Sequence, residues 1–221
     1  MGIHFILASQ SPRRRELIQL LGYPFEVMVA DVDETSVTEP NPAVNVVQTA
    51  QLKATEIIDQ LTDSLLPTNS IIIAADTTVA FAGEMLNKPA DEAEARLMLQ
   101  RLRNKQHKVH TGMVLLELES GYLWQGVSTA VVTMRNYSDA EIEAYVASGD
   151  PLDKAGAYAI QHPHFRPVAH LDGCYCCVMG LPVCDLIVAL SRFNVPPPAD
   201  LTAVSQAHLH YPCPTLASLI I

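Results

Sequence analysis

The chain of 221 residues has a formal net charge of -10, is 49% hydrophobic and 17% charged, and is long enough to bury a substantial core. This acidic balance argues against a broad basic face for nucleic-acid binding, so an anionic ligand would need a local basic pocket. No run of about eighteen apolar residues occurs, and the N-terminus lacks a signal-peptide pattern, so we expect a cytoplasmic protein with no membrane association.

The first elements follow clear local signals. Residues 3–8 are predicted to form a short buried strand, and Ser11 to begin a helix that Gly22 ends. A second strand is predicted over residues 25–30. After a polar loop, a helix is predicted over residues 43–60.

The middle of the chain predicts the centre of a sheet. Residues 71–79 are β-branched and almost uninterrupted, which is typical of a strand buried on both faces. Residues 109–118 and 122–134 are predicted to form a long hairpin. Asp91 and Ser138 each begin a helix with a glutamate three residues later.

The last third is predicted to contain less regular structure. From residue 155 to Pro182 we expect a loop, followed by a helix that ends near residue 193. The remainder is rich in proline and predicts an extended tail. The chain is therefore divided into one domain over residues 1–193 and a tail over residues 194–221.

The segment from Ser9 to Arg15 outlines an anion site, because a strand there runs into a helix whose first turn holds three arginines. Free N–H groups and the helix dipole favour a phosphate at such a helix start. Arginines at this position cost about 0.3–1 kcal/mol each unless an anion offsets them. Successive helical residues point about 100° apart, so at most two of the arginines can face one ligand. An exposed helix start paired with Glu16 or Glu34 is the alternative.

Asp76 interrupts the apolar strand, where an ionised carboxylate needs a metal, a cation or several hydrogen-bond donors. It can orient or deprotonate a water molecule. With Glu34 it can also hold a divalent ion that bridges to substrate phosphates. A carboxylate that only begins a turn is the alternative interpretation.

Further polar residues are weaker candidates. Lys53, Lys88 and Lys154 lie in separate segments, as expected if several loops converge on one polyanion, although a single lysine is usually a solvated surface residue. Gln161 offers an amide donor and acceptor that can read a base edge or bond to backbone.

Cysteines and histidines gather near the C-terminus. Four of the five cysteines lie between Cys174 and Cys184, which fits reduced thiols better than secreted disulfides. A nucleophilic role for them has no histidine partner that the sequence identifies. Tail residues including Cys213 match no established zinc spacing. We therefore expect surface positions for His162, His164, His208 and His210.

In order along the chain, these segments resemble motifs of the Maf family of nucleoside triphosphate pyrophosphatases. The resemblance covers about residues 3–193. It is carried by residues 7–17, Asp31–Glu34, Ala75–Thr77, Lys88–Asp91, His107 with Thr111–Gly112, Asp153–Tyr158 and Gly180–Pro182. Two positions depart from the family pattern, since Cys177 replaces a usual asparagine and Asn87 a common glycine.

The resemblance implies a mixed α/β (α+β) fold related to inosine triphosphate pyrophosphatases, with two lobes around a central mixed sheet and an active-site cleft, and often a homodimer. It implies Asp76 as the catalytic base acting on water, and Glu34 with Asp76 as ligands of Mg²⁺ or Mn²⁺. The implied phosphate-binding residues are Ser9, Arg14, Lys53, Lys88 and Lys154.

Substrate preference is implied by three residues, Arg13, Thr77 and Gln161, which resemble those of the branch that prefers dTTP and UTP. The resemblance thus implies hydrolysis of dTTP, UTP or modified pyrimidine nucleotides to the monophosphate and pyrophosphate. The branch that prefers 7-methyl-GTP, with tryptophan where Arg13 stands, is the second reading. A nucleic-acid-binding or septum-regulatory protein without hydrolase activity is the alternative of another class.

Overall fold

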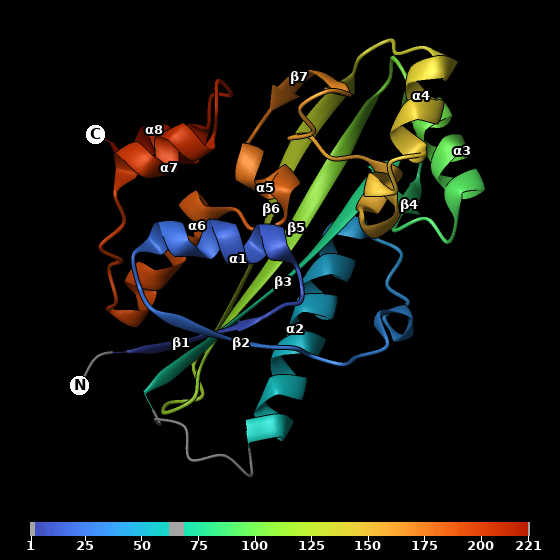
Figure 1. The fold of residues 1–221 in the computed structure, drawn as a ribbon. Helices are drawn as coiled ribbons and strands as arrows, with labels where there is room; N and C mark the ends of the chain where they lie inside the picture. Colours follow the sequence, from blue (N-terminus) through green and yellow to red (C-terminus); the bar gives the residue numbers. More distant parts are fainter. Residues whose placement is uncertain (1–2, 62–68, 221) are drawn as a thin grey trace.

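A mixed seven-stranded sheet organises the computed structural model, which describes residues 3–61 and 69–220 (Figure 1). The strand order is β2-β1-β3-β5-β6-β7, and β4 pairs with the end of β3. Strands β1, β2 and β3 are parallel, whereas the remaining pairs are antiparallel. The strands are β1 (His4–Ala8), β2 (Phe25–Met28), β3 (Ser70–Phe81), β4 (Glu84–Leu86), β5 (Gln106–Glu117), β6 (Leu123–Met134) and β7 (Val168–Asp172).

Helices cover both faces of this sheet, so the predicted mixed α/β fold is confirmed. The long helix α2 lies on one side of the strands, and α1, α5 and α6 lie on the other (Figure 1). The helices are α1 (Pro12–Ile18), α2 (Pro42–Leu61), α3 (Glu92–Leu102), α4 (Asp139–Val146), α5 (Tyr175–Met179), α6 (Val183–Leu190), α7 (Leu201–Ala207) and α8 (Pro214–Leu219).

Side-chain alternation along the strands divides the core into two layers. Ile6, Ile72 and Val114 belong to the cluster that includes four buried apolar residues of α2. Phe5 and Ile71, one position earlier, belong to the larger cluster on the opposite face. Because β3 is covered on both faces, residues 71–75 are all apolar and buried, and the prediction of a central buried strand is confirmed.

The predicted helix boundaries are set by the expected capping residues. Ser11 accepts a hydrogen bond from the backbone N–H of Arg14, and Gly22 ends the following 3₁₀ turn in the left-handed conformation. Ser138 and Glu141 form a complete capping box at α4. Asp91 caps α3, although the Glu94 carboxylate accepts from the N–H of Ala90 instead of completing the box.

A glycine lets α2 approach the sheet closely. Gly112 on β5 is the register partner of Asp76 on β3. A Cβ atom at Gly112 would lie 2.5 Å from the backbone carbonyl of Val46 on α2. Only glycine therefore allows α2, which carries Lys53, to lie this close to the strand that carries Asp76.

The predicted loop after residue 155 is wrong at two places, β7 and α5. Only one of the five residues of β7 is buried, so this strand lacks the alternation by which strands are recognised. Helix α5 is five residues long and no side chain caps its N-terminus. Both elements depend on packing against the rest of the molecule.

The C-terminal residues do not form the predicted extended tail. Asp200 caps α7, and a proline in the first turn begins α8. Val204 and Leu216 of these helices are buried. The Tyr23 hydroxyl donates to the carbonyl of Pro196 at 3.0 Å, which helps to hold the segment against the body of the protein. Within residues 3–61 and 69–220, no helix has the length and apolar character needed to cross a membrane.

Candidate active site

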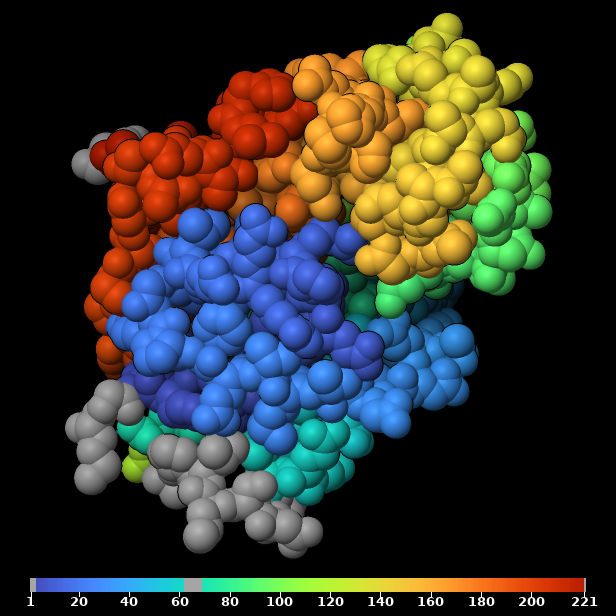
Figure 2. Space-filling model, viewed as in Figure 1, coloured from blue at the N-terminus to red at the C-terminus, as the bar shows by residue number. Residues whose placement is uncertain are grey.

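One cleft of about 750 Å³ brings the predicted site residues together. In Figure 2 it lies where the blue N-terminal segment meets the yellow-orange segment around residue 155. The residues proposed from sequence that line it are Ser9, Arg13, Arg14, Glu34, Lys53, Asp76, Thr77, Lys88, Lys154 and Gln161.

Strand order explains why distant residues meet in this cleft. Strands β1 and β3 are parallel neighbours, with Ala8 beside Ala74. The turn after β1 therefore lies next to Asp76, which is two residues beyond the part of β3 that pairs with β1. The carboxyl ends of parallel strands are a common place for ligand sites for this reason.

The ammonium group of Lys53 joins the two candidate carboxylates. Its Nζ lies 2.7 Å from Oδ1 of Asp76 and 2.8 Å from Oε1 of Glu34. Lys53 is buried and Asp76 is largely so, whereas the Glu34 side chain is 48% exposed. Burial raises the pKa of Glu34, but the charges of Lys53, Lys88 and Arg14 outweigh this effect and hold it below its ordinary value. Both carboxylates are thus arranged around positive charge.

The same pair has the donor chemistry that a hard divalent cation requires. Among the described residues, the hydrogen bonds of the pair to Lys53 use one oxygen of each carboxylate. The second oxygens of Asp76 and Glu34 can therefore bind a cation without breaking the contact with Lys53. Oxygen ligands from one or two carboxylates, completed by water and phosphate, are the usual surroundings of Mg²⁺.

Arg14, which also lines the cleft, is fixed by three contacts. Its Nε donates to the carbonyl of Gly180 at 2.7 Å, and its NH2 donates to Oγ1 of Thr77 at 3.1 Å. A longer contact of 3.5 Å joins NH1 to the hydroxyl of Ser9. Burial lowers the pKa of Arg14, an effect opposed by the charges of Asp76 and Glu34. The guanidinium is thus oriented before any ligand arrives.

Thr77 acts as a link in a directed chain of hydrogen bonds. The Thr111 hydroxyl donates to the carbonyl of Cys177, so its single proton is used there. Thr77 must then donate to Thr111, at 2.9 Å, which leaves its own oxygen to accept from Arg14. Sequence reasoning identified Thr111 only as a motif residue and did not identify this positioning role, because the partners are far apart in the chain.

The three arginines of α1 separate as helical geometry predicts. Arg13 and Arg14 line the cleft, whereas Arg15 is exposed and does not. Arg13 is 3.5 Å from the carboxylate of Asp153. The cleft therefore receives two guanidinium groups, one fixed by backbone and one paired with a surface acid.

The two remaining lysines, Lys154 and Lys88, differ in how many of their ammonium protons are already hydrogen-bonded within the protein. The Lys154 ammonium is buried and donates to the carbonyl and carboxylate of Asp150 and to the carboxylate of Asp153. All three of its protons are thus used within its own loop. Lys88 is exposed and forms no ion pair within the described parts of the chain. Its charge is nevertheless near enough to lower the pKa of Glu34.

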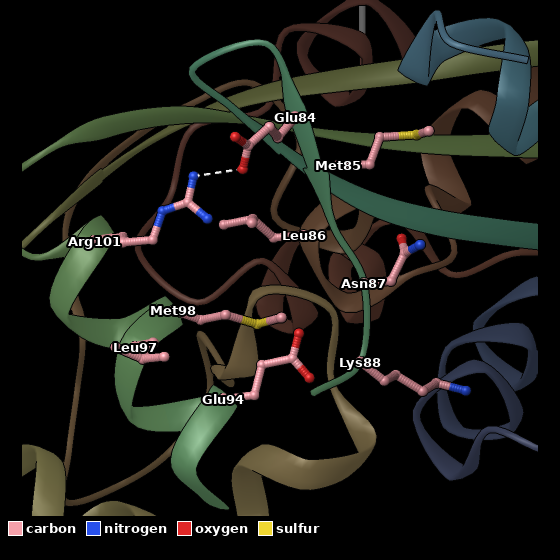
Figure 3. A pocket seen from close by; sticks show the side chains of 9 residues that line it. All are labelled: Glu84, Met85, Leu86, Asn87, Lys88, Glu94, Leu97, Met98 and Arg101. Carbon is pink, nitrogen blue, oxygen red and sulfur yellow. Dashed lines mark hydrogen bonds and ion pairs between the residues drawn. The ribbon is translucent and has the colours of Figure 1, made fainter. Parts of the chain in front are cut away.

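A smaller hollow of about 470 Å³ lies beside the cleft, between β4 and α3. Figure 3 shows that Lys88 extends away from the other side chains of this hollow, while Glu84 and Arg101 form an ion pair at its far end. Asn87 also borders both spaces, and its side-chain oxygen accepts from Thr78 at 2.9 Å. The residue that replaces the family glycine is therefore bonded to β3.

The cysteine cluster lies outside the cleft and is not built as a nucleophile. Cys174 has a histidine partner that sequence reasoning missed, since its Sγ lies 3.3 Å from Nε2 of His208. Cys174 is 5% exposed and His208 is 1% exposed, so a substrate has no access to them. The prediction that His208 lies on the surface is therefore wrong, whereas His164 and His210 are exposed as predicted and His162 is half-buried. Burial of Cys177 raises the pKa of that thiol to about 12, which keeps it protonated.

Comparison with known proteins gives a consistent result. Residues 4–193 match the family model described as Maf-like protein. The chain is 40% identical to a dTTP/UTP pyrophosphatase of Bacillus cereus (strain AH820) over 190 residues, which is 86% of this chain and 95% of that protein. A dTTP/UTP pyrophosphatase of Bacillus anthracis gives the same identity and coverage. Among solved structures, a HAM1 protein from Coxiella burnetii is 17% identical with a TM-score of 0.39, covering 62% of this chain and 75% of that one.

Proposed function

The chain belongs to the family of Maf-like proteins, and from this premise we propose that it is a nucleoside triphosphate pyrophosphatase. We propose dTTP and UTP as its substrates, and the nucleoside monophosphate and pyrophosphate as its products. The names of the relatives that are 40% identical support this reaction. The observation that carries it is the contact of Lys53 with both Asp76 and Glu34 in the cleft that Arg14 lines.

In the proposed reaction, Asp76 aligns a water molecule and takes its proton. The water oxygen bonds to the α-phosphorus, and the bond from that phosphorus to the bridging oxygen breaks. The electron pair of this bond leaves with pyrophosphate. Lys53 keeps the Asp76 carboxylate in place through its 2.7 Å contact. Fixed charge of this kind supplies much of the rate enhancement in phosphoryl and nucleotidyl chemistry.

We assign phosphate binding to the side chains whose hydrogen-bond donors are not all used within the protein. We propose Arg14, Lys88 and the Ser9 hydroxyl as direct phosphate contacts, with Lys53 shared between phosphate and the carboxylates. Lys154 is proposed to act first on its loop, because its protons are engaged by Asp150 and Asp153. A phosphate at Lys154 would have to displace one of these acceptors.

A divalent cation, Mg²⁺ or Mn²⁺, is proposed at the second oxygens of Glu34 and Asp76. When bound there it would supply positive charge that stabilises the phosphate oxygens during cleavage. The exposed fraction of Glu34, 48%, leaves this carboxylate accessible from the cleft. Asp76 thus combines contact with Lys53 and a free oxygen for the cation.

Substrate selection is proposed to rest on Arg13, Thr77 and Gln161. Gln161 is half-buried in the wall of the cleft, where its amide can donate to and accept from a pyrimidine edge. Thr77 acts by holding Arg14 at 3.1 Å. Modified pyrimidine nucleotides present the same edges and are proposed as further substrates.

The proposed function is tested with a panel of nucleotides in the presence of Mg²⁺ or Mn²⁺. Turnover of dTTP and UTP with release of pyrophosphate is the expected result. Chromatography measures the nucleotide that is formed, and separate assays measure pyrophosphate and orthophosphate. Orthophosphate as the first product would reject the reaction. Turnover of 7-methyl-GTP or ITP with inert dTTP and UTP would reject the substrate.

Nucleic-acid binding by the same protein tests the alternative that it is a binding protein without hydrolase activity. A salt-sensitive complex with DNA or RNA that survives Arg14→Ala, together with no hydrolysis of any nucleotide, would favour a binding protein. We also propose that the protein works in the cytoplasm as a homodimer. The five free cysteines support a reducing compartment, and light scattering of the purified chain tests the dimer.

A further inference from the structure

Four buried side chains from three separate segments of the last quarter of the chain meet outside the cleft. They are Cys174 at the N-terminus of α5, Cys184 in α6, His208 after α7 and Cys213 before α8. All four are buried, and their candidate ligand atoms lie within 4.8 Å of one another. Two come from the region that matches the family and two from the segment beyond residue 193.

The distances within this group suit a tetrahedral ion. Nε2 of His208 lies 3.3 Å from Sγ of Cys174 and 3.6 Å from Sγ of Cys184. A Zn²⁺ ion with sulfur at about 2.3 Å and nitrogen at about 2.0 Å requires ligand atoms about 3.5–3.8 Å apart. The group therefore needs movements of only a few tenths of an ångström along these two edges.

The imidazole of His208 is already oriented for metal binding. Its Nδ1 lies 2.7 Å from the carbonyl of Val204, which can only accept, so Nδ1 carries the proton. In the neutral ring the lone pair then belongs to Nε2, the atom that faces the thiols. A metal-bound histidine usually donates a hydrogen bond of this kind, from the ring nitrogen that does not bind the metal to a carbonyl.

We propose that Cys174, Cys184, His208 and Cys213 bind one structural Zn²⁺ ion. Three thiolates and an imidazole complete a tetrahedron, which is the closed arrangement of structural zinc sites. The ion ties the segment of α7 and α8 to α5 and α6. The sequence alone did not indicate it, because the four ligands come from three separate segments and not from two short motifs.

The inference is independent of the proposed nucleotide chemistry, since none of the four residues lines the cleft. A disulfide within the group is the competing use of these thiols, and the cysteines are free in the structure. The two uses differ in metal content and in mass, so one experiment separates them.

The experiment measures metal in the full-length protein purified without added chelator. Elemental analysis is expected to give about one zinc per chain. His208→Ala is expected to weaken Zn²⁺ binding at least about a hundredfold, more than the loss of a supporting hydrogen bond. The control is His210→Ala, which removes an exposed histidine from the same segment and is expected to keep the zinc.

A second measurement needs no variant and so does not depend on whether His208→Ala folds. Protein stripped of metal under reducing conditions is titrated with Co²⁺, which reports its ligands by colour. The absorption spectrum is expected to show the d–d bands of tetrahedral Co²⁺ and thiolate-to-cobalt charge-transfer bands. These bands are expected to disappear when Zn²⁺ is added. Zinc-free wild-type protein that gives no such bands, or a mass that shows a disulfide among these cysteines, would overturn the proposal.

Discussion

The carboxylates of Asp76 and Glu34 share one ammonium group, and this sharing determines how substitutions in the cleft act. Lys53 lies within 2.8 Å of both side chains. Removal of either carboxylate leaves the buried ammonium of Lys53 with the other carboxylate, so its charge is still paired. Changes at Asp76 should consequently affect the chemistry more than the stability.

Asp76→Asn is therefore expected to lower kcat by about a hundredfold to ten-thousandfold, because the amide cannot take a proton from water. Nucleotide binding is expected to remain within a few-fold, since Arg14 and Lys88 are unchanged. Steady-state kinetics with dTTP and calorimetric binding measure the two effects. Asp31→Asn is the control, as Asp31 is an exposed carboxylate of the same cleft. An active Asp76→Asn enzyme would remove Asp76 from the proposed role.

A second residue-scale prediction concerns His107, which is buried on β5 and bonds through Nε2 to the hydroxyl of Tyr158 at 2.8 Å. Burial lowers the pKa of His107 to about 4 from an ordinary value of 6.5. The unfolded chain therefore takes up a proton at a pH where the folded protein does not. The contribution to stability is complete above pH 6.5 and is lost as the pH falls from there toward 4.

The free energy of unfolding should thus fall by up to about 1.4 kcal/mol per pH unit in that interval from this group. Urea unfolding at several pH values measures the slope. His107→Gln is expected to flatten it, whereas His170→Gln, at an exposed position, is expected to leave it unchanged. Equal slopes in wild type and His107→Gln would mean that another group titrates.

At the scale of elements, the close approach of α2 to β5 depends on Gly112. A methyl group there would lie 2.5 Å from the Val46 carbonyl, which is backbone and cannot rotate away. Gly112→Ala is expected to lower the free energy of unfolding by about 1–3 kcal/mol or more. It should also lower activity, because α2 carries Lys53.

Gly126→Ala on the neighbouring strand provides a matched control for this prediction. The added methyl group there meets the end of the Trp124 side chain, which is half-buried and can move. Urea unfolding of both variants gives the comparison. If Gly126→Ala were as damaging as Gly112→Ala, the backbone contact with α2 would not be the cause.

Elements also show what could be predicted from sequence. Strand β3, helix α2 and the β5–β6 hairpin carry their own periodicity or turn signals, and they were found with nearly the observed boundaries. Strand β7 and helix α5 have no such local signal and exist because of tertiary packing. The candidate residues of the cleft were found through motifs. Their mutual contacts, such as that of Lys53 with Asp76, depend on strand order, which no local pattern encodes.

At the scale of the whole molecule, the segment after residue 193 is part of the core. Val195, Val204 and Leu216 are each buried within the main hydrophobic cluster. Burial of three such side chains contributes about 4.5–9 kcal/mol. This is comparable with the total stability of many domains, about 5–15 kcal/mol.

Truncation after Phe193 is accordingly expected to destabilise the protein severely, with a loss of about 4.5–9 kcal/mol or failure to fold. Thermal and urea unfolding measure the loss. Truncation after Leu219, which removes the last two residues and with them the exposed Ile220, is the control and should be neutral. Full stability of the chain that ends at Phe193 would show that α7 and α8 contribute nothing to the core.

Helix α5 connects two sites that otherwise do not touch. Its N-cap is the zinc ligand Cys174, and its C-cap is Gly180, whose carbonyl accepts from Arg14 at 2.7 Å. A nucleotide whose phosphates bind Arg14 would act on one end of this helix through the Gly180 carbonyl, and the metal would act on the other end. Thermodynamic linkage makes such an influence reciprocal. Whatever factor nucleotide binding imposes on the affinity for zinc, zinc imposes on the affinity for the nucleotide.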